Sequence, residues 1–221
     1  MKKSPRYQTS HLTEDQFEPG SRGRVLKNIL HITSRREMDI IEAEWYALSV
    51  PLLAARFEKD HRFTAADICN IHKVWLGDIY AWAGQYRQVN ISKEGFPFAA
   101  ARHIPKLMQE LEKGALHKYT PCLFENDNEI ITALAVVHAE LMLIHPFREG
   151  NGRSGRLLAV LMAFQAGLPG LDFSGIRGKK KKAYFAAVQA GADQDYEPMK
   201  LVFNDVLSRT RRTLGGGHRK A

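Results

Sequence analysis

The segment 144–164, "IHPFREGNGRSGRLLAVLMAF", decides the fold that we expect. One apolar run with helical spacing leads into it and another leads out, so its polar middle should join two buried helices. Pro146 disfavours helical backbone at the preceding residue, which places His145 where the first helix ends. Gly-Asn-Gly at 150–152 suits a tight turn that brings bare backbone N–H groups close to an anion. The second helix should begin near Arg153.

Two features around this turn indicate a phosphate site. The N-terminus of a helix carries partial positive charge and free N–H groups, as in sites for di- and triphosphates. Arg153 and Arg156 stand three residues apart, on one face of the first turn of the second helix. Their guanidinium forks match phosphate oxygens. We therefore expect the turn and both arginines to bind a polyphosphate.

Glu149 and His145 complete the chemistry. Glu149 is the one acid in the loop, and a carboxylate beside phosphates is favourable when a cation such as Mg²⁺ lies between them. His145, with an ordinary pKa near 6.5, can take a proton from a hydroxyl at neutral pH. Together these groups predict the transfer of a nucleotide phosphate to an alcohol. His138 could pair with His145 on a metal, but no further ligand follows at helical spacing, so we favour a hydrogen-bonded core histidine.

Helical periodicity extends over most of the chain from Arg24 onward, which predicts an all-α fold. The expected N-caps are Ser34, Thr64 and Asn126. The expected helix ends are Pro51, where the helix should stop or kink, Gly84 and Gly167. The expected buried stripe of the first helix consists of Met38, Ile41, Trp45 and Leu48.

One segment departs from this period. Val89 and Ile91 alternate toward Lys93-Glu94-Gly95, and Phe96 and Phe98 follow, as in a short β-hairpin. A hairpin of two strands is marginal in water, so this one should pack down or receive another strand.

We divide the chain into three parts. Residues 1–23 are polar and punctuated by glycine and proline, so they should form an extended arm with little structure of its own. Residues 24–210 should form a single domain with its core at about 64–205. Residues 211–221 should form a basic, flexible tail.

Composition narrows the classes to which this protein can belong. The 221 residues carry 44% apolar side chains and a net charge of +8, and no apolar run is long enough to span a membrane. The N-terminus has no apolar segment typical of a secretory signal, which favours the cytoplasm, although delivery into a host cell stays open. Cys69 and Cys122 should be free thiols. The basic surplus comes without aromatic–basic alternation or zinc-ligand spacing, so an anionic small ligand is favoured over nucleic acid as the primary partner.

The segment "HPFREGNGRSGR" (145–156) resembles, at every fixed position, the signature H-x-F-x-[D/E]-G-N-G-R-x-x-R of the Fic (filamentation induced by cAMP) family. The segment "IYAWAGQYRQVNISKEG" (79–95) resembles the hairpin flap of this family, and "EPGSRGRVLKNILHI" (18–32) resembles the lead-in of bacterial Fic proteins. The resemblance covers about residues 18–205. It implies a Fic-type helical bundle that transfers AMP from ATP, with Mg²⁺, to a Ser, Thr or Tyr hydroxyl of a target protein.

The resemblance also implies a role for each site residue. His145 would be the general base, Phe147 would anchor the loop in the core, and Glu149 would hold Mg²⁺. The implied ATP-binding residues are Gly150, Asn151, Gly152, Arg153 and Arg156, with the glycine amides in the anion hole, Asn151 near the α-phosphate and the arginines on the β- and γ-phosphates. The implied flap, which would clamp the target backbone by strand addition, comprises Val89, Asn90, Ile91, Ser92, Lys93, Glu94 and Gly95.

Control of the activity depends on a second family motif, [S/T]-x-x-x-E-[G/N], whose glutamate pairs with the second arginine. The nearest candidate runs from Thr33 to Glu37, but Met38 follows in place of Gly or Asn. We therefore favour Glu37 as part of a capping box with Ser34. The chain then resembles the toxin class, whose inhibitory helix is carried by a separate small antitoxin.

Two alternatives stay open. Some relatives keep the loop and transfer phosphate, UMP or phosphocholine, although the intact motif favours AMP. A basic, nonenzymatic protein that retains a nucleotide-binding loop would bind ATP without transferring any part of it.

Overall fold

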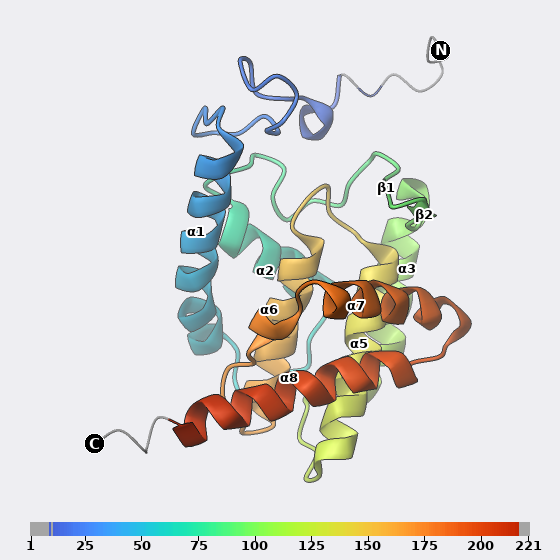
Figure 1. The fold of residues 1–221 in the computed structure, drawn as a ribbon. Coiled ribbons are helices and arrows are strands. Elements are labelled where there is room, and N and C mark those ends of the chain that lie inside the picture. The colour runs from blue at the N-terminus through green and yellow to red at the C-terminus, as the bar shows by residue number, and fades with distance from the viewer. Residues whose placement is uncertain (1–8, 10, 217–221) are drawn as a thin grey trace.

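The structure, a computed structural model, describes residue 9 and residues 11–216. Within this part of the chain nearly all regular structure is helical, with one antiparallel pair of short strands (Figure 1). The expected all-α fold with a small hairpin is therefore confirmed. The longer helices are α1 (Arg35–Arg56), α2 (Ala65–Leu76), α3 (Ile104–Leu111), α5 (Asp127–Ile144), α6 (Asn151–Gln165), α7 (Lys179–Ala190) and α8 (Glu197–Gly216). The short elements are a 3-10 turn at Thr13–Asp15, strands β1 (Ser92–Lys93) and β2 (Phe96–Pro97), 3-10 turns at Ala101–His103, Phe173–Gly175 and Gly191–Asp193, a π-helical turn at Glu112–Leu116 and α4 (His117–Tyr119).

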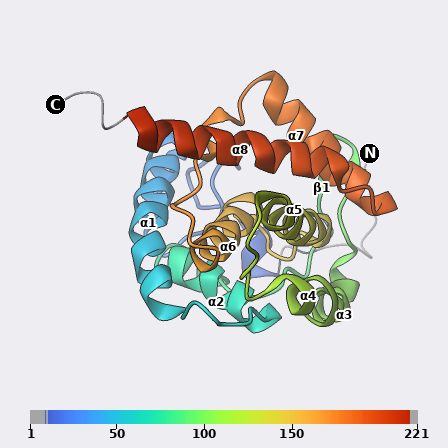
Figure 2. The same cartoon turned by 90° about the horizontal axis from the view of Figure 1, so that it is seen from below.

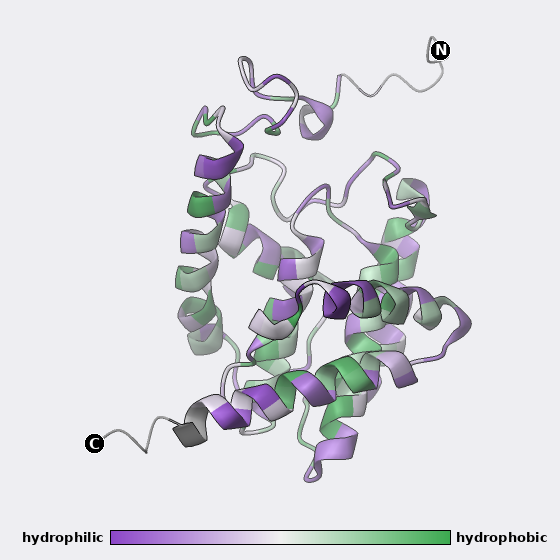
Figure 3. Ribbon diagram, in the orientation of Figure 1, coloured by the Kyte–Doolittle hydropathy of each residue, from purple (hydrophilic) through white to green (hydrophobic). Residues whose placement is uncertain are grey.

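Helix α5 forms the centre of the core. It is apolar on nearly every face, and it contacts α3, α6, α7 and α8. Seen from below, α5 and α6 lie nearly end-on in the middle, with α1 and α2 on one side and α3 and α4 on another (Figure 2). Helix α8 crosses this group, and polar and apolar residues alternate along it (Figure 3). Its buried residues are Met199, Phe203, Val206, Leu207 and Thr210. An all-round apolar helix is thus enclosed by amphipathic ones.

The three expected N-caps are confirmed. Ser34, Thr64 and Asn126 each accept a hydrogen bond from the backbone N–H three residues later. Pro198 lies in the first turn of α8, where its missing N–H costs no helical hydrogen bond. None of the helices in the described part has the length and apolar character required to cross a membrane.

Helix α1 differs from the expectation in two ways. It passes through Pro51 and ends at Arg56, because the loss of one helical hydrogen bond is offset by packing on α2 and α6. Its fully buried positions are Met38, Glu42, Ser49 and Leu53, whereas Leu48 is 58% exposed. The buried face therefore carries a carboxylate, which an apolar stripe cannot indicate.

Two helix boundaries also differ. Helix α2 ends at Leu76 rather than at Gly84, and turns within residues 77–84 carry the buried Ile79, Tyr80 and Trp82. Helix α6 begins at Asn151, two residues before Arg153. Gly150, the N-cap, has a φ of +83° and so marks the end of the loop.

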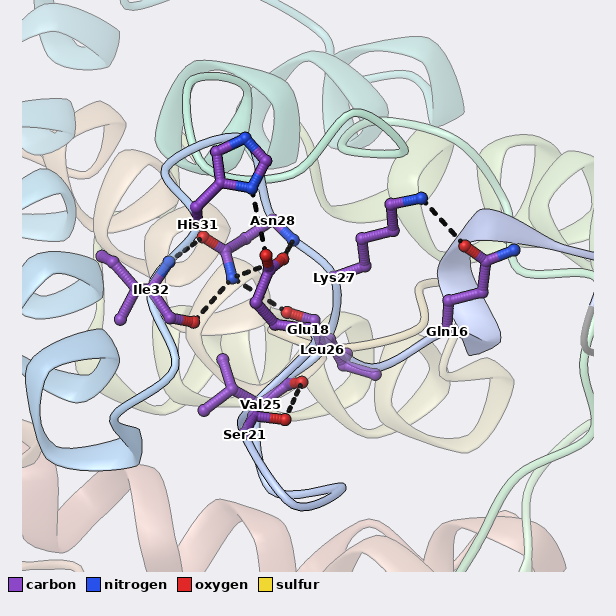
Figure 4. A network of polar contacts seen from close by, with 9 residues as sticks. All are labelled: Gln16, Glu18, Ser21, Val25, Leu26, Lys27, Asn28, His31 and Ile32. Atoms are coloured by element: carbon purple, nitrogen blue, oxygen red, sulfur yellow. Dashed lines mark hydrogen bonds and ion pairs between the residues drawn. The ribbon is translucent and has the colours of Figure 1, made fainter.

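The segment before α1 is folded, contrary to the expected extended arm and its boundary at residue 23. Residues 11–32 form a 3-10 turn, a β-bridge between Phe17 and Leu26, and the hydrogen-bond network in Figure 4. The buried Glu18 carboxylate accepts the Asn28 N–H (Oε2, 3.1 Å) and lies 3.0 Å from His31 Nδ1. The Asn28 N–H lowers the pKa of Glu18. Residues 1–8 and 10 lie outside the described part.

Residues 211–216, which we expected in the flexible tail, are helical. Helix α8 continues to Gly216, and Arg211 donates two hydrogen bonds to the Asp127 carboxylate, at 2.5 and 2.7 Å. This ion pair joins α8 to the start of α5. Residues 217–221 lie outside the described part.

The hairpin is present, with strands of only two residues each. Ser92 faces Pro97 and Lys93 faces Phe96. The two turn residues, Glu94 and Gly95, both have positive φ, at 51° and 85°, as in a type I′ turn. Beyond this pair, Phe98 N–H donates to the Ile91 carbonyl at 3.2 Å.

Candidate active site

A cavity of about 650 Å³ lies between the hairpin, the end of α5, the start of α6 and α7. We call residues 145–150 the loop and residues 89–98 the flap. The predicted site residues that line the cavity are His145, Glu149, Gly150, Asn151, Gly152, Arg153, Arg156, Ile91, Ser92 and Lys93. The structure therefore brings the predicted phosphate, acid and base groups to one cavity.

His145 is the C-cap of α5, in left-handed backbone conformation at φ 52° and ψ 60°. Its Nδ1 lies 3.1 Å from the Met142 carbonyl, so Nδ1–H donates and Nε2 keeps its lone pair. The ring stacks on Phe98 of the flap, with centroids 3.7 Å apart. Burial is the main cause that lowers the pKa of His145 to about 4. The imidazole is therefore neutral, and able to accept a proton, across the physiological pH range.

Phe147 and Asn151 hold the loop in its conformation. Phe147 is fully buried. The Asn151 side chain accepts the Phe147 N–H at 2.8 Å and donates to the Phe147 carbonyl at 2.7 Å. The Asn151 amide is thus engaged with the loop backbone, its expected place near the α-phosphate stays a prediction, and the free N–H groups of the first turn of α6 are left for an anion.

His72 of α2 is a loop-supporting residue that the sequence analysis did not identify. Its ring stacks on Phe147 at 3.9 Å between centroids. The Gly84 N–H donates to His72 Nδ1 at 2.8 Å, and His72 Nε2–H donates to the Glu149 carbonyl at 3.1 Å. Burial lowers the pKa of His72 to about 4, so the neutral tautomer persists. A helical apolar pattern with one histidine gives no signal for this role.

Gly150 is required at its position for two reasons. Its φ of +83° is unfavourable for other residues, and a Cβ there would lie 2.9 Å from Trp75 and 3.0 Å from Leu76. Its N–H donates to the Glu149 carboxylate at 3.0 Å, so the amide of Gly150 is already engaged in this structure.

Arg153 lines the cavity but is paired with a buried carboxylate, so its expected role on the β- and γ-phosphates stays a prediction. Glu42 of α1 is 1% exposed and accepts from Arg153 at 2.6 Å and from the Tyr80 hydroxyl at 2.8 Å. The Arg153 guanidinium also lies 4.5 Å from the Trp75 ring centroid. Sequence reasoning missed Glu42 because its partner is 111 residues away.

Arg156 differs from Arg153 in its contacts. Within the described part it forms no ion pair, its Nε is buried without a hydrogen-bond partner, and its guanidinium lies 5.6 Å from the Phe173 ring. Of the two arginines, Arg156 is the one whose donors are available to an anion in the cavity.

Glu149 is the carboxylate that projects to the cavity. Its side chain is 40% exposed and lies 4.0 Å from Arg153. Among residues 9 and 11–216, no cluster of three or more His, Cys, Asp or Glu side chains is arranged to hold a metal ion. A single carboxylate fits Mg²⁺ that arrives with a nucleotide, because this ion is usually held by one or two carboxylates and by substrate phosphates.

His138 is a hydrogen-bonded core residue, as the sequence analysis favoured. Its Nδ1–H donates to the Gly155 carbonyl at 3.3 Å, and the Tyr184 hydroxyl donates to Nε2 at 2.8 Å. Both nitrogens are engaged, so no lone pair is left for a metal. Burial lowers the pKa of His138 to about 4.

The flap divides into a base and an exposed part. Val89 is buried, and the Asn90 side chain accepts the Ala101 N–H at 2.8 Å, so these two residues hold the flap rather than face a target. Residues 92–95 are exposed. Lys93 reaches α7, where its ammonium lies 4.1 Å from the Phe185 ring centroid.

Glu37, the candidate for internal inhibition, lies on the exposed side of the first turn of α1 and does not line the cavity. Its backbone N–H donates to Ser34 Oγ at 3.4 Å. This contact is that of a helix cap. A full capping box, in which the side chain of the third helical residue also accepts the N–H of the cap residue, is present at Thr64 and Asp67 of α2.

Comparison with known proteins gives consistent matches. The Fic/DOC family model matches residues 62–163. The chain is 34% identical over 143 residues to "Probable protein adenylyltransferase Fic" of Escherichia coli (strain K12), covering 62% of this chain and 66% of that protein. It is 31% identical over 155 residues to the protein of the same name from Salmonella typhimurium, covering 66% of this chain and 70% of that one. The chain thus spans about two thirds of the length of these relatives.

Two solved structures resemble the fold over most of its length. The crystal structure of the BepC protein, a VirB-translocated effector of Bartonella tribocorum with bound AMPPNP, has a TM-score of 0.71 and 26% identity, and covers 89% of this chain and 97% of that one. The N-terminal Fic domain of a cell filamentation protein from Bartonella quintana, with bound ADP, has a TM-score of 0.69 and 27% identity, with 89% and 95% covered. Taken with the signature, the fold and the matching relatives, these likenesses show that the chain belongs to the Fic/DOC family.

Proposed function

We propose that this chain transfers AMP from ATP to a Ser, Thr or Tyr hydroxyl of a target protein in the cytoplasm. The observation that carries the proposal is a neutral His145, with Nδ1 committed to Met142, on the same cavity as Arg156 and the N-terminus of α6. The relatives named protein adenylyltransferase and the similar structures with bound AMPPNP and ADP support the same conclusion.

The triphosphate binds at the start of α6. The first N–H groups of a helix lack partners within the helix and point toward an anion. Arg156 adds a guanidinium without an ion pair in the described part, and Lys93 and Lys181 line the same cavity. Ile176, Phe185 and Val188 form an apolar wall on the α7 side, and the nucleotide base packs there.

Glu149 would hold Mg²⁺ together with the phosphates. The bound ion supplies charge neutralisation between the carboxylate and the phosphate oxygens. The Gly150 N–H orients the carboxylate from the loop side.

His145 performs the proton transfer. The target hydroxyl oxygen attacks the α-phosphorus while Nε2 takes the hydroxyl proton, and the bond from the α-phosphorus to the bridging oxygen breaks, which releases pyrophosphate. The Met142 carbonyl accepts from Nδ1–H and stabilises the imidazolium that forms. The exposed edge of the flap binds target backbone as an added strand and presents the hydroxyl to His145.

A small partner protein restrains this activity. No complete inhibitory motif occurs in the sequence, and Arg156 has no carboxylate partner in the described part. A partner helix that lays a glutamate against Arg156 would displace the γ-phosphate and misplace the α-phosphate. The test is to express the chain with and without the product of the neighbouring reading frame and to compare growth. Equal growth in both strains contradicts the restraint.

The decisive experiment compares two labels. Purified protein is incubated with cell lysate and either α-³²P-ATP or γ-³²P-ATP, beside His145→Ala as the control. Label retained only from the α-position supports AMP transfer. Label from the γ-position means phosphate transfer, and ATP binding without any label on protein means a nonenzymatic role; either result rejects the proposal.

A further inference from the structure

Arg87 is a buried arginine that serves only backbone carbonyls. It is 1% exposed and is among the largest fully buried side chains. Its Nε donates to the His145 carbonyl at 2.8 Å, and Nη1 donates to the Val89 carbonyl at 2.6 Å. Its Nη2 donates to the Ala99 carbonyl at 2.6 Å and to the Ile144 carbonyl at 3.3 Å. No ion pair of Arg87 occurs in the described part of the chain.

The charge is balanced by the end of a helix and by the nearby Glu14 carboxylate. The last carbonyls of α5 have no partner within the helix and carry the negative end of its dipole, and Ile144 and His145 are at that end. The main chain adds a fifth contact, because the Arg87 N–H donates to the Pro146 carbonyl at 2.9 Å. Arg87 is therefore bound to three consecutive residues at the end of α5.

The other two carbonyls belong to the base of the flap. Val89 is its first residue, and Ala99 follows its last. A single guanidinium thus bridges the two ends of the flap. It also joins them to His145, the proposed proton acceptor. The main chain adds one weaker link to the same helix end, because the Ala99 N–H donates to the Leu143 carbonyl at 3.4 Å, and the Phe98 ring contacts His145 by stacking.

We infer that Arg87 is a positioning residue that fixes the flap relative to His145, and so sets where a docked target hydroxyl lies against Nε2. The inference rests on the proposed function for its kinetic consequence only. Its structural content, a guanidinium that links both ends of the flap to the end of α5 through four carbonyls, stands on the contacts above.

Only a guanidinium suits this arrangement. Its donors point in fixed directions within one plane, so three nitrogens reach four carbonyls on two separate segments. A lysine ammonium offers three donors on one atom and cannot reach both segments at once. Arg87→Lys therefore keeps the charge and loses the link.

The test combines hydrogen exchange with kinetics on the full chain. Arg87→Lys should speed amide exchange about tenfold in peptides that cover 89–99 and 144–147, as expected for the loss of a charge-assisted hydrogen bond, and leave α8 unchanged. It should raise the KM for the protein target and lower kcat, while the Kd for ATP stays within about twofold. Arg102→Lys, at an exposed position beside the flap, is the matched control and should change none of these quantities.

A double variant tests the route. If Arg87 acts through the flap, Ile91→Pro should raise KM much less in the Arg87→Lys background than in the wild type. Should Arg87→Lys fail to fold, Arg87→Gln, which buries no charge, takes the same measurements. Unchanged exchange in 89–99, or equal effects on ATP and target, overturns the inference. A wild type that transfers no AMP rejects the proposed function instead, and the exchange result alone then decides the role of Arg87.

Discussion

The loop and the flap line the same cavity but are held in opposite ways. The loop is fixed from behind by buried groups: Phe147 in the core, the Asn151 amide on its backbone and His72 on the Glu149 carbonyl. The flap has two-residue strands and an exposed turn, its hydrogen bonds to the rest of the fold gather at its ends, and Lys93 and Phe98 add ring contacts to Phe185 and His145. The part that we propose to bind the nucleotide, the same in every reaction, is thus preformed. The part that we propose to bind protein targets offers backbone hydrogen-bonding groups that do not depend on target side chains.

The largest expected effect comes from the residue at the meeting point of the two regions. His145→Ala should lower AMP transfer by about 10²–10⁴-fold, because a positioned general base contributes that much. The Kd for ATP and the melting temperature should stay close to wild type, since in the proposed site the phosphate groups bind at α6. Labelling with α-³²P-ATP, calorimetric titration and thermal melting measure the three quantities. His103→Ala, at an exposed position, is the control. Wild-type labelling by His145→Ala would reject the assignment.

The second prediction distinguishes a role in stability, for Arg153, from a role in ATP binding, for Arg156. Arg153→Ala leaves Glu42 buried without its cation, so it should cost about 3–5 kcal/mol of folding free energy. Arg156→Ala should cost less than about 1 kcal/mol and should instead weaken ATP binding, because its guanidinium has no carboxylate partner in the described part. Urea unfolding and calorimetric titration distinguish the two. Equal losses of stability in the two variants would show that the ion pair with Glu42 does not make Arg153 more important for stability than Arg156.

The third prediction concerns pH and the core histidine His138, which joins α5 to α6 and α7. The pKa of His138 is about 4 in the folded chain and about 6.5 in the unfolded chain. Between these values the unfolded chain binds more protons, so stability is complete above about pH 6.5 and is lost as pH falls toward 4. His138 should contribute up to about 1.4 kcal/mol per pH unit to this slope. Urea unfolding at several pH values should show a smaller slope in His138→Gln. An unchanged slope would contradict the prediction.

The smallest effect is expected in the flap. Ile91→Pro removes one backbone N–H from the edge and should raise the KM for the protein target about 3–10-fold, the equivalent of one hydrogen bond. The melting temperature and the Kd for ATP should not change. Ile91→Val, which keeps the N–H, is the matched control and should behave as wild type. A comparable rise of KM in both variants would mean that the side chain, not the backbone, binds the target.

The sequence predicted the fold and the residues of the loop because both depend on local patterns. The periodicity around α5 and α6, the three N-caps and the two turn residues Glu94 and Gly95 are each set by neighbours in the chain. The predicted loop residues also come together at one cavity, since they occupy a single short segment.

The supports of the site could not be predicted in this way. Glu42 appears in sequence as one more charge on an amphipathic helix, and Arg87 as a polar residue before a hairpin. Their burial is favourable only because partners 111 and 58 residues away supply hydrogen bonds. Glu14 is similar, since its buried carboxylate accepts the Gln88 N–H 74 residues later. Glu14 and Glu42 both lie outside the region 62–163 that matches the family model.

These long sequence separations bear on the order of events during synthesis. Asp15 pairs with Arg148 across 133 residues, and Glu42 with Arg153 across 111. Contacts between distant residues form late, because a large loss of chain entropy precedes them. A growing chain that has emerged only to α5 has neither the arginines nor the α6 terminus that bind phosphate. The proposed catalytic centre is therefore assembled only after the chain has been made through α6, and a shorter nascent chain lacks the groups that we propose to bind the triphosphate.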